Sequence, residues 1–417
     1  METRTMSDGD PYKFKTRIKT LLNRIKTNPE MEQAKKEQIK EFYRYLQMED
    51  LSNPRIHRHL SCINLLMIHM DFNITNPDKK DILELVRKIN NSTVGTIDKL
   101  APSTKAEYKK TLKKFYKDYL NTVKEDINGR ELVNFFNTKG KAGSVDYKNL
   151  LKPRHIKKLI AKPDRIRDKA FLMTLWTTAG RIGEILGLKW KDVFFEKDMA
   201  KIRFRETKTG DSRTVPIHVG FLYLKELKEK DHKGDDPEAF LFRSMQSDEQ
   251  LSYSGSSNII KRARKKTDIP SRIKTNPHSW RKARATYLST QGMNQQQIAK
   301  YGGWVQGSDK LATYIRLGKA NVEAGVRQLS GLEANDTEPE PDLKPTKCYN
   351  CGKFNKFEAD NCSNCGTVLK TSKAFTDLKV RETKEELKNT IIKENIGMDE
   401  QKIREKAKEL VKNNIRT

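Results

Sequence analysis

This sequence lacks any apolar run long enough to cross a membrane. A membrane-spanning helix needs roughly 18 to 20 apolar residues, and no stretch of the 417 residues approaches that length. The N-terminus, METRTMSDGDPYKFK, also lacks the apolar segment of a secretory signal. Hydrophobic residues make up only 35% of the chain and charged residues 33%. This balance favours two or three small domains joined by charged linkers over one large globule.

Acidic residues are scarce relative to basic ones. Lysine and arginine number 83 against 55 aspartates and glutamates, which gives a formal net charge of +28. Such an excess repels itself unless an anion neutralises it, and nucleic acid is the commonest polyanionic partner. Charge alone does not separate DNA from RNA, from acidic membranes or from an ordinary solvated surface.

Cysteine is also rare, with five residues in the chain. Cys62 stands alone in the apolar stretch HLSCINLLMIHM and is predicted to be a buried small hydrophobe. The other four form two CxxC pairs, which favour metal binding over disulfides and hence a reducing, cytoplasmic setting.

The first 140 residues are predicted to form a helical domain. Apolar residues recur at helical spacing in IKTLLNRI, QIKEFYRYLQM, INLLMIHM and STKAEYKKTLKKFYKDYL, with many lysines between them. A glycine-containing polar stretch at 137–149 marks the expected domain boundary.

A second domain is predicted over residues 150–332. KIRFRETKTGDSRTVPI alternates apolar and polar residues on both sides of Thr209-Gly210-Asp211, which indicates a β-hairpin. Helices are expected at 153–161, 166–178, 182–188, 219–229, 256–266, 279–291 and 294–301. The fold class is therefore mainly α with a small sheet.

Three segments of this domain carry residues suited to phosphate chemistry. In TTAGRIGEILGLKW, Arg181 lies at a helix start beside a buried face, where a guanidinium is costly unless it meets an anion or a salt-bridge partner such as Glu184. In HSWR, His278 and Arg281 share one helical face and together could grip a phosphate and move a proton. In GGWVQGSDKLATYIRL, a glycine turn precedes Trp304, and Tyr314 follows ten residues later. Each segment alone is a weak motif.

Together, and in this order, these segments resemble the tyrosine recombinase (phage integrase) family. The family pattern is an Arg, a hairpin Lys, HxxR, a His or Trp, and a nucleophilic Tyr, and the similarity covers roughly residues 90–330. It implies a core-binding domain and a catalytic domain that clamp double-stranded DNA, a covalent 3′-phosphotyrosyl intermediate, and four protomers on two DNA sites.

The resemblance also implies a role for each residue. Arg181 and Arg281 would clamp the phosphate, Tyr314 would attack it, Lys208 would protonate the leaving 5′-oxygen and His278 would accept a proton or bind the phosphate. Trp304 would line the phosphate pocket, and Glu184 would orient it. Tyr301 and Tyr287 remain alternative nucleophiles, and Lys201 and Lys189 alternative lysines. The sequence has no GxxxxGK[ST] motif for ATP and no acidic cluster typical of a two-metal nuclease.

The four-cysteine segment is predicted to be a zinc ribbon over residues 347–370. Cys348, Cys351, Cys362 and Cys365 follow the pattern CxxC, ten residues, CxxC, with a glycine after each pair. Four thiolates complete a tetrahedral zinc site, so one structural ion is expected and no catalytic cofactor. A redox CxxC pair is the alternative, although no thioredoxin-like βαβ pattern surrounds it.

The remaining segments lie outside the two main domains. An acidic, proline-containing stretch, 333–346, is expected to be a flexible linker, and residues 375–417 a charged helical tail. Residues 318–331 are the expected helix for contacts between protomers. The lead hypothesis is a site-specific recombinase or integrase of a prokaryote, with an archaeal mobile element or virus as a suitable source. A type IB topoisomerase-like activity, a degenerate DNA-binding regulator and an RNA-binding zinc-ribbon protein are the alternatives.

Overall fold

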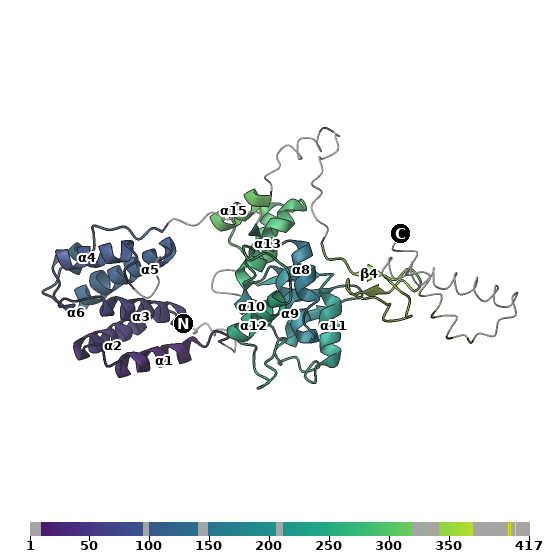
Figure 1. The fold of residues 1–417 in the computed structure, drawn as a ribbon, viewed down its shortest axis with the longest axis horizontal. Coiled ribbons are helices and arrows are strands. Elements are labelled where there is room, and N and C mark those ends of the chain that lie inside the picture. Colours follow the sequence, from purple (N-terminus) through teal and green to yellow (C-terminus); the bar gives the residue numbers. More distant parts are fainter. Residues whose placement is uncertain are drawn as a thin grey trace. The chain divides into compact units, whose positions relative to one another are not determined.

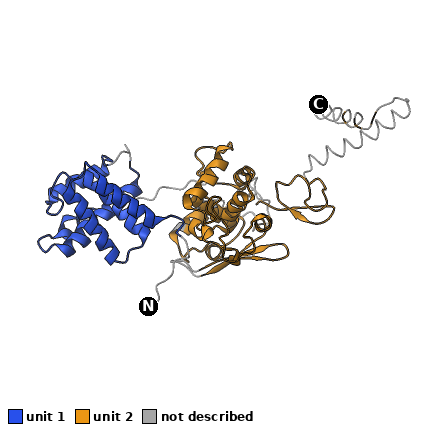
Figure 2. Cartoon of the chain, turned by 90° about the horizontal axis from the view of Figure 1, so that it is seen from below, with its two compact units in different colours: residues 1–145 blue, residues 146–417 orange. Residues whose placement is uncertain are grey.

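The computed structural model describes residues 10–94, 100–140, 149–205, 212–318 and 342–369, with Ser330, Asp399, Gln401 and Glu405. The chain divides into two compact units, Met1–Val145 and Asp146–Thr417 (Figure 2). This division falls inside the polar stretch where the boundary was expected. No helix among the described residues is long and apolar enough to cross a membrane.

Unit 1 is a helical bundle, because the apolar positions of its helices repeat every three to four residues and meet in one core. Aromatic and aliphatic side chains, among them Phe42, Phe115 and Leu66, are fully buried there. Cys62 is buried, as predicted, and burial raises the pKa of its thiol to about 11. The elements are α1 (Phe14–Thr27), α2 (Gln33–Met48), α3 (Asn53–Ile68), α4 (Lys79–Asn90), α5 (Pro102–Lys113), the π-helical turn η1 (Lys114–Leu120), α6 (Asn121–Val123) and α7 (Gly129–Leu132).

Unit 2 places helices around a small antiparallel sheet with the order β1-β2-β3 (Figure 1). The predicted hairpin is present, with Ile202 paired to Val215 and both side chains buried. Its tip, residues 206–211, lies outside the described residues. The strands are β1 (Val193–Phe195), β2 (Ala200–Phe204) and β3 (Arg213–Ile217), and β1 was not predicted.

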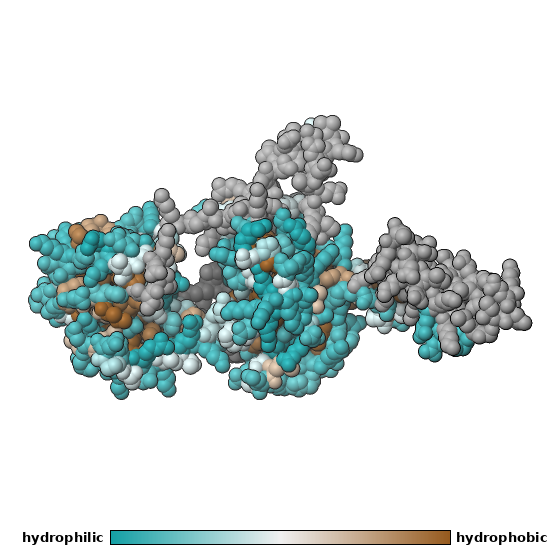
Figure 3. Space-filling model, viewed as in Figure 1, coloured by the Kyte–Doolittle hydropathy of each residue, from teal (hydrophilic) through white to brown (hydrophobic). Residues whose placement is uncertain are grey.

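The helices of unit 2 follow the predicted ranges closely. They are α8 (Pro153–Ile160), α9 (Ile166–Thr178), α10 (Ile182–Leu186), α11 (Phe221–Lys230), α12 (Tyr253–Lys265), α13 (Pro277–Thr290), α14 (Gln295–Gly302) and α15 (Asp309–Gly318), with the short turn η3 (Trp190–Asp192). Helix α9 is buried on nearly all sides, whereas the outward surface of both units is mainly hydrophilic in the view of Figure 3. The mainly helical fold with a small sheet is confirmed.

A short two-stranded ribbon, β4 (Thr346–Lys347) and β5 (Phe354–Asn355), belongs to the four-cysteine segment. The expectation of a flexible linker over 333–346 needs correction at its end. Leu343 is fully buried, and the Asp342 carboxylate is bound by Trp176 and Arg284. An apolar side chain and a paired carboxylate fix this part of the segment to unit 2. The rest of it, like residues 319–329 and most of the tail, lies outside the described residues.

Candidate active site

The turn between α9 and α10 presents Arg181. Helix α9 ends at Thr178, and the next residue, Ala179, adopts a left-handed conformation with φ 49° and is fully buried. This conformation costs a non-glycine residue on the order of 1 kcal/mol. In return, the Ala179 carbonyl accepts a hydrogen bond from the Arg281 guanidinium. The turn therefore brings together two arginines that are 100 positions apart in the sequence.

Arg181 is held by a carboxylate that is shared with a second arginine. Glu184 Oε1 accepts from Arg181 Nη1 at 2.8 Å, and Glu184 Oε2 accepts from the Arg181 backbone N–H at 3.0 Å. Arg213 Nη2 donates to Glu184 Oε2 at 2.6 Å. Burial by itself raises the pKa of Glu184, but Arg213 and Arg181 outweigh it and hold the pKa below its ordinary value. Glu184 is thus an ionised bridge between two guanidinium groups.

Sequence reasoning missed Arg213, which stands at the start of β3 without a recognisable motif. Its side chain is only 7% exposed, its guanidinium lies 4.3 Å from the centre of the Phe204 ring, and its Nε donates to the Tyr301 carbonyl at 3.2 Å. The only signal was an arginine on the strand that follows the hairpin lysine. The partner of Arg213, Glu184 of α10, could be identified only from the folded structure.

Arg281 is buried in α13 with part of its hydrogen-bonding capacity unused. Its Nη1 donates to the carbonyls of Ala179 and Gly302, the latter at 2.5 Å, and its guanidinium lies 3.5 Å from the centre of the Trp304 ring. Its Nη2 is buried and has no hydrogen-bond partner among the described residues. Burial first, then the neighbouring Arg181 and Arg213, lower the pKa of Arg281 to about 9. An anion at Nη2 would relieve both the missing bond and the repulsion.

Tyr314 lies in α15, which packs against α13. The Thr286 hydroxyl donates to the Tyr314 carbonyl at 3.2 Å, and Lys282 Nζ lies 5.7 Å from the centre of the Tyr314 ring. Burial raises the pKa of the Tyr314 hydroxyl, while the charge of Arg281 opposes that rise. The charge of Arg281 therefore acts on the phenol as well as on Arg181.

The two alternative tyrosines are engaged elsewhere. The Tyr301 hydroxyl donates to the Thr177 carbonyl, and burial raises its pKa. Tyr287 packs against Trp176, with 5.7 Å between ring centres, and carries the Arg284 guanidinium 5.4 Å from its own ring centre. Both tyrosines thus serve the interior packing of unit 2.

Comparisons with known proteins cover the stretch of chain that contains these residues. Residues 149–320 match the phage integrase family. Unit 2 is therefore similar to the phage integrase family over this stretch. The chain is 29% identical over 139 residues to tyrosine recombinase XerA of Pyrococcus horikoshii, covering 33% of this chain and 47% of that protein. It is 29% identical over 190 residues to tyrosine recombinase XerA of Pyrococcus furiosus, covering 44% of this chain and 62% of that protein. The chain thus spans about half to three fifths of the length of these two relatives.

The fold of the chain also resembles a solved recombinase structure. A lambda integrase dimer bound to a COC′ core site superposes with a TM-score of 0.52 at 15% identity, covering 67% of this chain and 76% of that one. Arg181, Arg281 and Tyr314 all lie within the stretch that matches the family. The three residues for which active-site roles were expected therefore all belong to the part of the chain that is similar to the family.

His278 and Trp304 flank Arg281 in different ways. His278 is exposed in the first turn of α13, whose start is capped by Asn276, and it lies one turn before Arg281. Trp304 follows the end of α14, where Gly303 has φ 68°, and its indole covers the Arg281 guanidinium. A Cβ on Gly303 would lie 2.5 Å from Arg213 Nη1, so the domain needs glycine there on two grounds.

The choice of lysine for the candidate site remains a prediction. Lys208 lies in 206–211, outside the described residues. Both alternatives pair with carboxylates: Lys201 with Glu196 at 2.6 Å and Lys189 with Glu238 at 3.1 Å. A lysine held in this way is a poorer proton donor to DNA, so the structure gives no reason to prefer either over Lys208.

The four predicted metal ligands lie close together, and all four follow the stretch that matches the family. The sulfurs of Cys348, Cys351, Cys362 and Cys365 all lie within 4.8 Å of one another. The Cys348–Cys365 and Cys351–Cys362 pairs are 3.6 and 3.5 Å apart. Sulfurs bonded to one tetrahedral zinc ion at about 2.3 Å would lie roughly 3.8 Å apart, so the cluster is compatible with a zinc site. Gly352 and Gly366, which follow the two CxxC pairs, take left-handed conformations.

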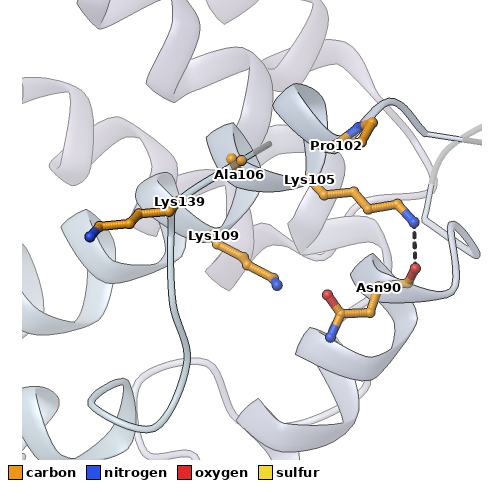
Figure 4. A pocket seen from close by; sticks show the side chains of 7 residues that line it. Asn90, Pro102, Lys105, Ala106, Lys109 and Lys139 are labelled. Carbon is orange, nitrogen blue, oxygen red and sulfur yellow. Dashed lines mark hydrogen bonds between the residues drawn. The ribbon is translucent and has the colours of Figure 1, made fainter. Parts of the chain in front are cut away.

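Unit 1 contributes a small basic pocket at the start of α5. It has a volume of about 240 Å³ and is lined by Asn90, Pro102, Lys105, Ala106, Lys109, Lys139 and Gly140. Figure 4 shows the lysine side chains around it, with Lys105 donating to the Asn90 carbonyl. Burial and the charge of Lys105 lower the pKa of Lys109. Three lysines around one hollow favour an anion.

Proposed function

We propose that the protein is a site-specific DNA recombinase or integrase that cleaves and rejoins DNA through a 3′-phosphotyrosyl intermediate without ATP. One observation supports this most strongly. Arg281 Nη2 is buried and has no hydrogen-bond partner in the part of the chain that the structure describes, and the charge of Arg281 is coupled to Arg181, Arg213 and Tyr314. An unpaired buried donor beside two further guanidinium groups is costly unless a substrate anion completes it.

The proposed reaction follows from these side chains. Arg181 and Arg281 bind the non-bridging oxygens of a phosphodiester and offset the charge that grows in the transition state. The oxygen of Tyr314 forms a bond to phosphorus as the bond to the 5′-oxygen breaks. His278 accepts the phenolic proton or binds the phosphate, and Lys208 protonates the departing oxygen. Because the tyrosyl bond stores the energy of the broken phosphodiester, the reverse attack by a 5′-hydroxyl rejoins the strand.

Glu184 and Trp304 support the reaction without bonding to phosphorus. Glu184 fixes the direction of Arg181 and supplies a negative charge that lets Arg181 and Arg213 lie close together. Trp304 covers one face of the Arg281 guanidinium and excludes water from it. Since burial raises the pKa of the Tyr314 phenol, the positive charge of Arg281 and a proton acceptor such as His278 would promote loss of its proton.

Double-stranded DNA is the proposed substrate, and both units are proposed to bind it. The formal net charge of +28 supports this, as do the lysines of the unit 1 pocket. Residues 1–140 would serve as the core-binding domain and residues 150–332 as the catalytic domain. Exchange between two duplexes requires the cutting of four strands, and each protomer supplies one Tyr314. A homotetramer on two sites is therefore proposed, with residues 318–331 as the contact segment.

The four cysteines are proposed to hold one structural zinc ion in a zinc ribbon over residues 347–370. Four sulfurs at tetrahedral spacing support this proposal, as do the two left-handed glycines. When bound, the ion would fold a segment that has almost no apolar core of its own. With four cysteine ligands the zinc ion would have no free coordination position for substrate. The catalytic step would therefore rest on residues of the stretch that matches the family.

The test uses a DNA duplex with a nick near the cleavage site, which loses a short fragment after cleavage and traps the covalent adduct. The wild-type protein should give an adduct that survives denaturation, and Tyr314→Phe should give none. Tyr301→Phe and Tyr287→Phe should still form it, although more slowly if packing is disturbed. An adduct that persists in Tyr314→Phe would overturn the nucleophile assignment.

Two further outcomes separate the alternatives. A wild-type chain that binds DNA but never forms an adduct would be a regulator on a degenerate scaffold. A chain that forms the adduct and relaxes supercoiled DNA, but never exchanges strands between two sites, would act like a type IB topoisomerase.

A further inference from the structure

Asp342 lies beyond the stretch that matches the family, yet it completes the interior of the catalytic domain. Its Oδ1 accepts from the Trp176 indole N–H at 2.8 Å and from the Leu343 backbone N–H at 2.9 Å. Its Oδ2 accepts from Arg284 Nη1 at 2.5 Å. Trp176 belongs to α9 and Arg284 to α13, so one carboxylate ties together α9, which ends three residues before Arg181, and α13, which carries Arg281.

Arg284 depends on this carboxylate. Its side chain is 9% exposed, and its guanidinium stacks on the rings of Trp176 and Tyr287. Burial lowers the pKa of Arg284, but the Tyr301 hydroxyl and the Asp342 carboxylate outweigh burial and keep the pKa above its ordinary value. Among the charged groups of the described residues, Asp342 is the carboxylate that pairs with Arg284. Without it, a buried cation would keep only neutral partners, which is a strongly unfavourable state.

A short chain of contacts leads from Arg284 to the reacting groups. Arg284 stacks on Trp176, and the carbonyl of the next residue, Thr177, accepts a hydrogen bond from the Tyr301 hydroxyl. The Tyr301 carbonyl accepts from Arg213, and Arg213 binds Glu184, which holds Arg181. Arg284 also follows Arg281 by three residues on α13, so the two side chains leave the same helix about one turn apart.

The cysteine segment secures Asp342 from the other side. Leu343, the next residue, is fully buried. Farther along, Glu358 accepts from the Tyr223 hydroxyl and lies 3.5 Å from Lys169 Nζ, and Lys356 pairs with Glu226. Lys169 belongs to α9, and Tyr223 and Glu226 belong to α11. The segment is therefore docked on α11 and on α9, which is one of the two helices that Asp342 joins.

We propose that Asp342 is a positioning residue for DNA cleavage: it acts in cis from outside the family-matching region and sets the placement of Arg281 and Arg181 through Arg284. The proposal rests on the proposed recombinase function. It assigns to the C-terminal extension a share in building the active site, in addition to any contact it makes with DNA or another protein.

Asp342→Asn is the decisive variant. The amide oxygen can still accept from Trp176 and Leu343, but the amide nitrogen cannot accept from Arg284, and the negative charge is gone. The matched control is Asp268→Asn, which removes the same charge from an exposed pair with Lys158 at 2.7 Å. Asp342→Glu restores a carboxylate and serves as the conservative rescue.

Single-turnover cleavage of the nicked duplex is measured at saturating DNA, together with the DNA dissociation constant. Asp342→Asn should lower the rate constant by about 10- to 100-fold, because small displacements of catalytic groups cost that much. The final amount of adduct and the DNA affinity should stay near the wild-type values. Asp268→Asn should match the wild type, and Asp342→Glu should recover part of the rate.

The outcomes divide clearly. If Asp342→Asn lowers the final amount of adduct while the rate constant of the remaining active molecules is unchanged, Asp342 only holds the fold together and the proposal is wrong. An unchanged rate constant and an unchanged final amount would overturn it as well. A wild-type chain that forms no adduct would instead overturn the proposed function, on which this inference depends.

Discussion

Arg213 and Glu184 form an ion pair of 2.6 Å in which each side chain is only 7% exposed. The same carboxylate holds the more exposed Arg181 at 2.8 Å. This buried pair fixes the direction of the Arg181 side chain, because Arg213 holds one oxygen of Glu184 in place while the other oxygen binds the Arg181 guanidinium.

Replacing Arg213 with alanine should therefore destabilise unit 2 and abolish cleavage. Removal of one partner of a buried ion pair costs about 3 to 5 kcal/mol, since the remaining charge stays buried with less compensation. Urea unfolding followed by tryptophan fluorescence measures the loss. Arg203→Ala, at an exposed position on the adjacent strand, is the control and should change the free energy of unfolding by less than about 0.5 kcal/mol. Equal stabilities for the two variants would contradict the assignment.

Gly303→Ala should impair cleavage more than Gly307→Ala. Both glycines have positive φ values, 68° and 76°, so alanine strains the backbone at each. Only at Gly303 would the added Cβ collide, at 2.5 Å, with Arg213 Nη1, because nothing lies within 4 Å of the corresponding position at Gly307. The difference between the two single-turnover cleavage rates isolates the displacement of Arg213. Indistinguishable rates would mean that backbone strain alone matters.

The stability contributed by Glu184 should be lost on the acid side. Its pKa in the folded chain lies below the ordinary value of 4.5, so the folded state binds a proton less readily than the unfolded state. The contribution is fully present above about pH 4.5 and disappears as the pH falls through the lowered value. Unfolding of the wild type and of Glu184→Gln between pH 3 and 7 should show two curves that separate as pH rises. Parallel curves would refute the ionised bridge.

Removing the metal should unfold the four-cysteine segment. Structural zinc in small modules contributes on the order of 10 kcal/mol to folding, and this segment offers little apolar core of its own. Mass spectrometry under native conditions should find one zinc ion in the wild type and in Cys62→Ser, whose buried thiol lies outside the cluster. Cys362→Ser should bind none, and limited proteolysis should then cut within 347–369. Full zinc content in Cys362→Ser would contradict the ligand set.

The pocket of unit 1 should contribute to the salt dependence of DNA binding. Changing Lys105, Lys109 and Lys139 together to alanine should make the slope of log affinity against log salt shallower by up to about 0.9 per lost phosphate contact. The control changes Lys15, Lys19 and Lys26, which are exposed on and near one face of α1, and removes the same charge. Equal slopes for the two triple variants would show that only net charge matters.

The sequence by itself determined most helices of both units, the hairpin and the residues proposed for the site, whereas α4 and α15 had no predicted range. Apolar spacing depends on neighbours within a few positions, and Arg181, HSWR, the GGW turn and Tyr314 stand in local motifs. The CxxC spacing likewise places ligands by chain geometry alone. Local information of this kind can be read without a fold.

Only the tertiary structure decided which charges meet. Arg213 lies 29 positions from Glu184, and Asp342 lies 58 positions from Arg284, so neither pair leaves a periodic or spacing signal. Their strength comes from burial, which excludes water and makes each missing partner costly. Burial arises only when helices from distant stretches pack together, and for that reason the end of the expected linker proved to be part of the interior of unit 2.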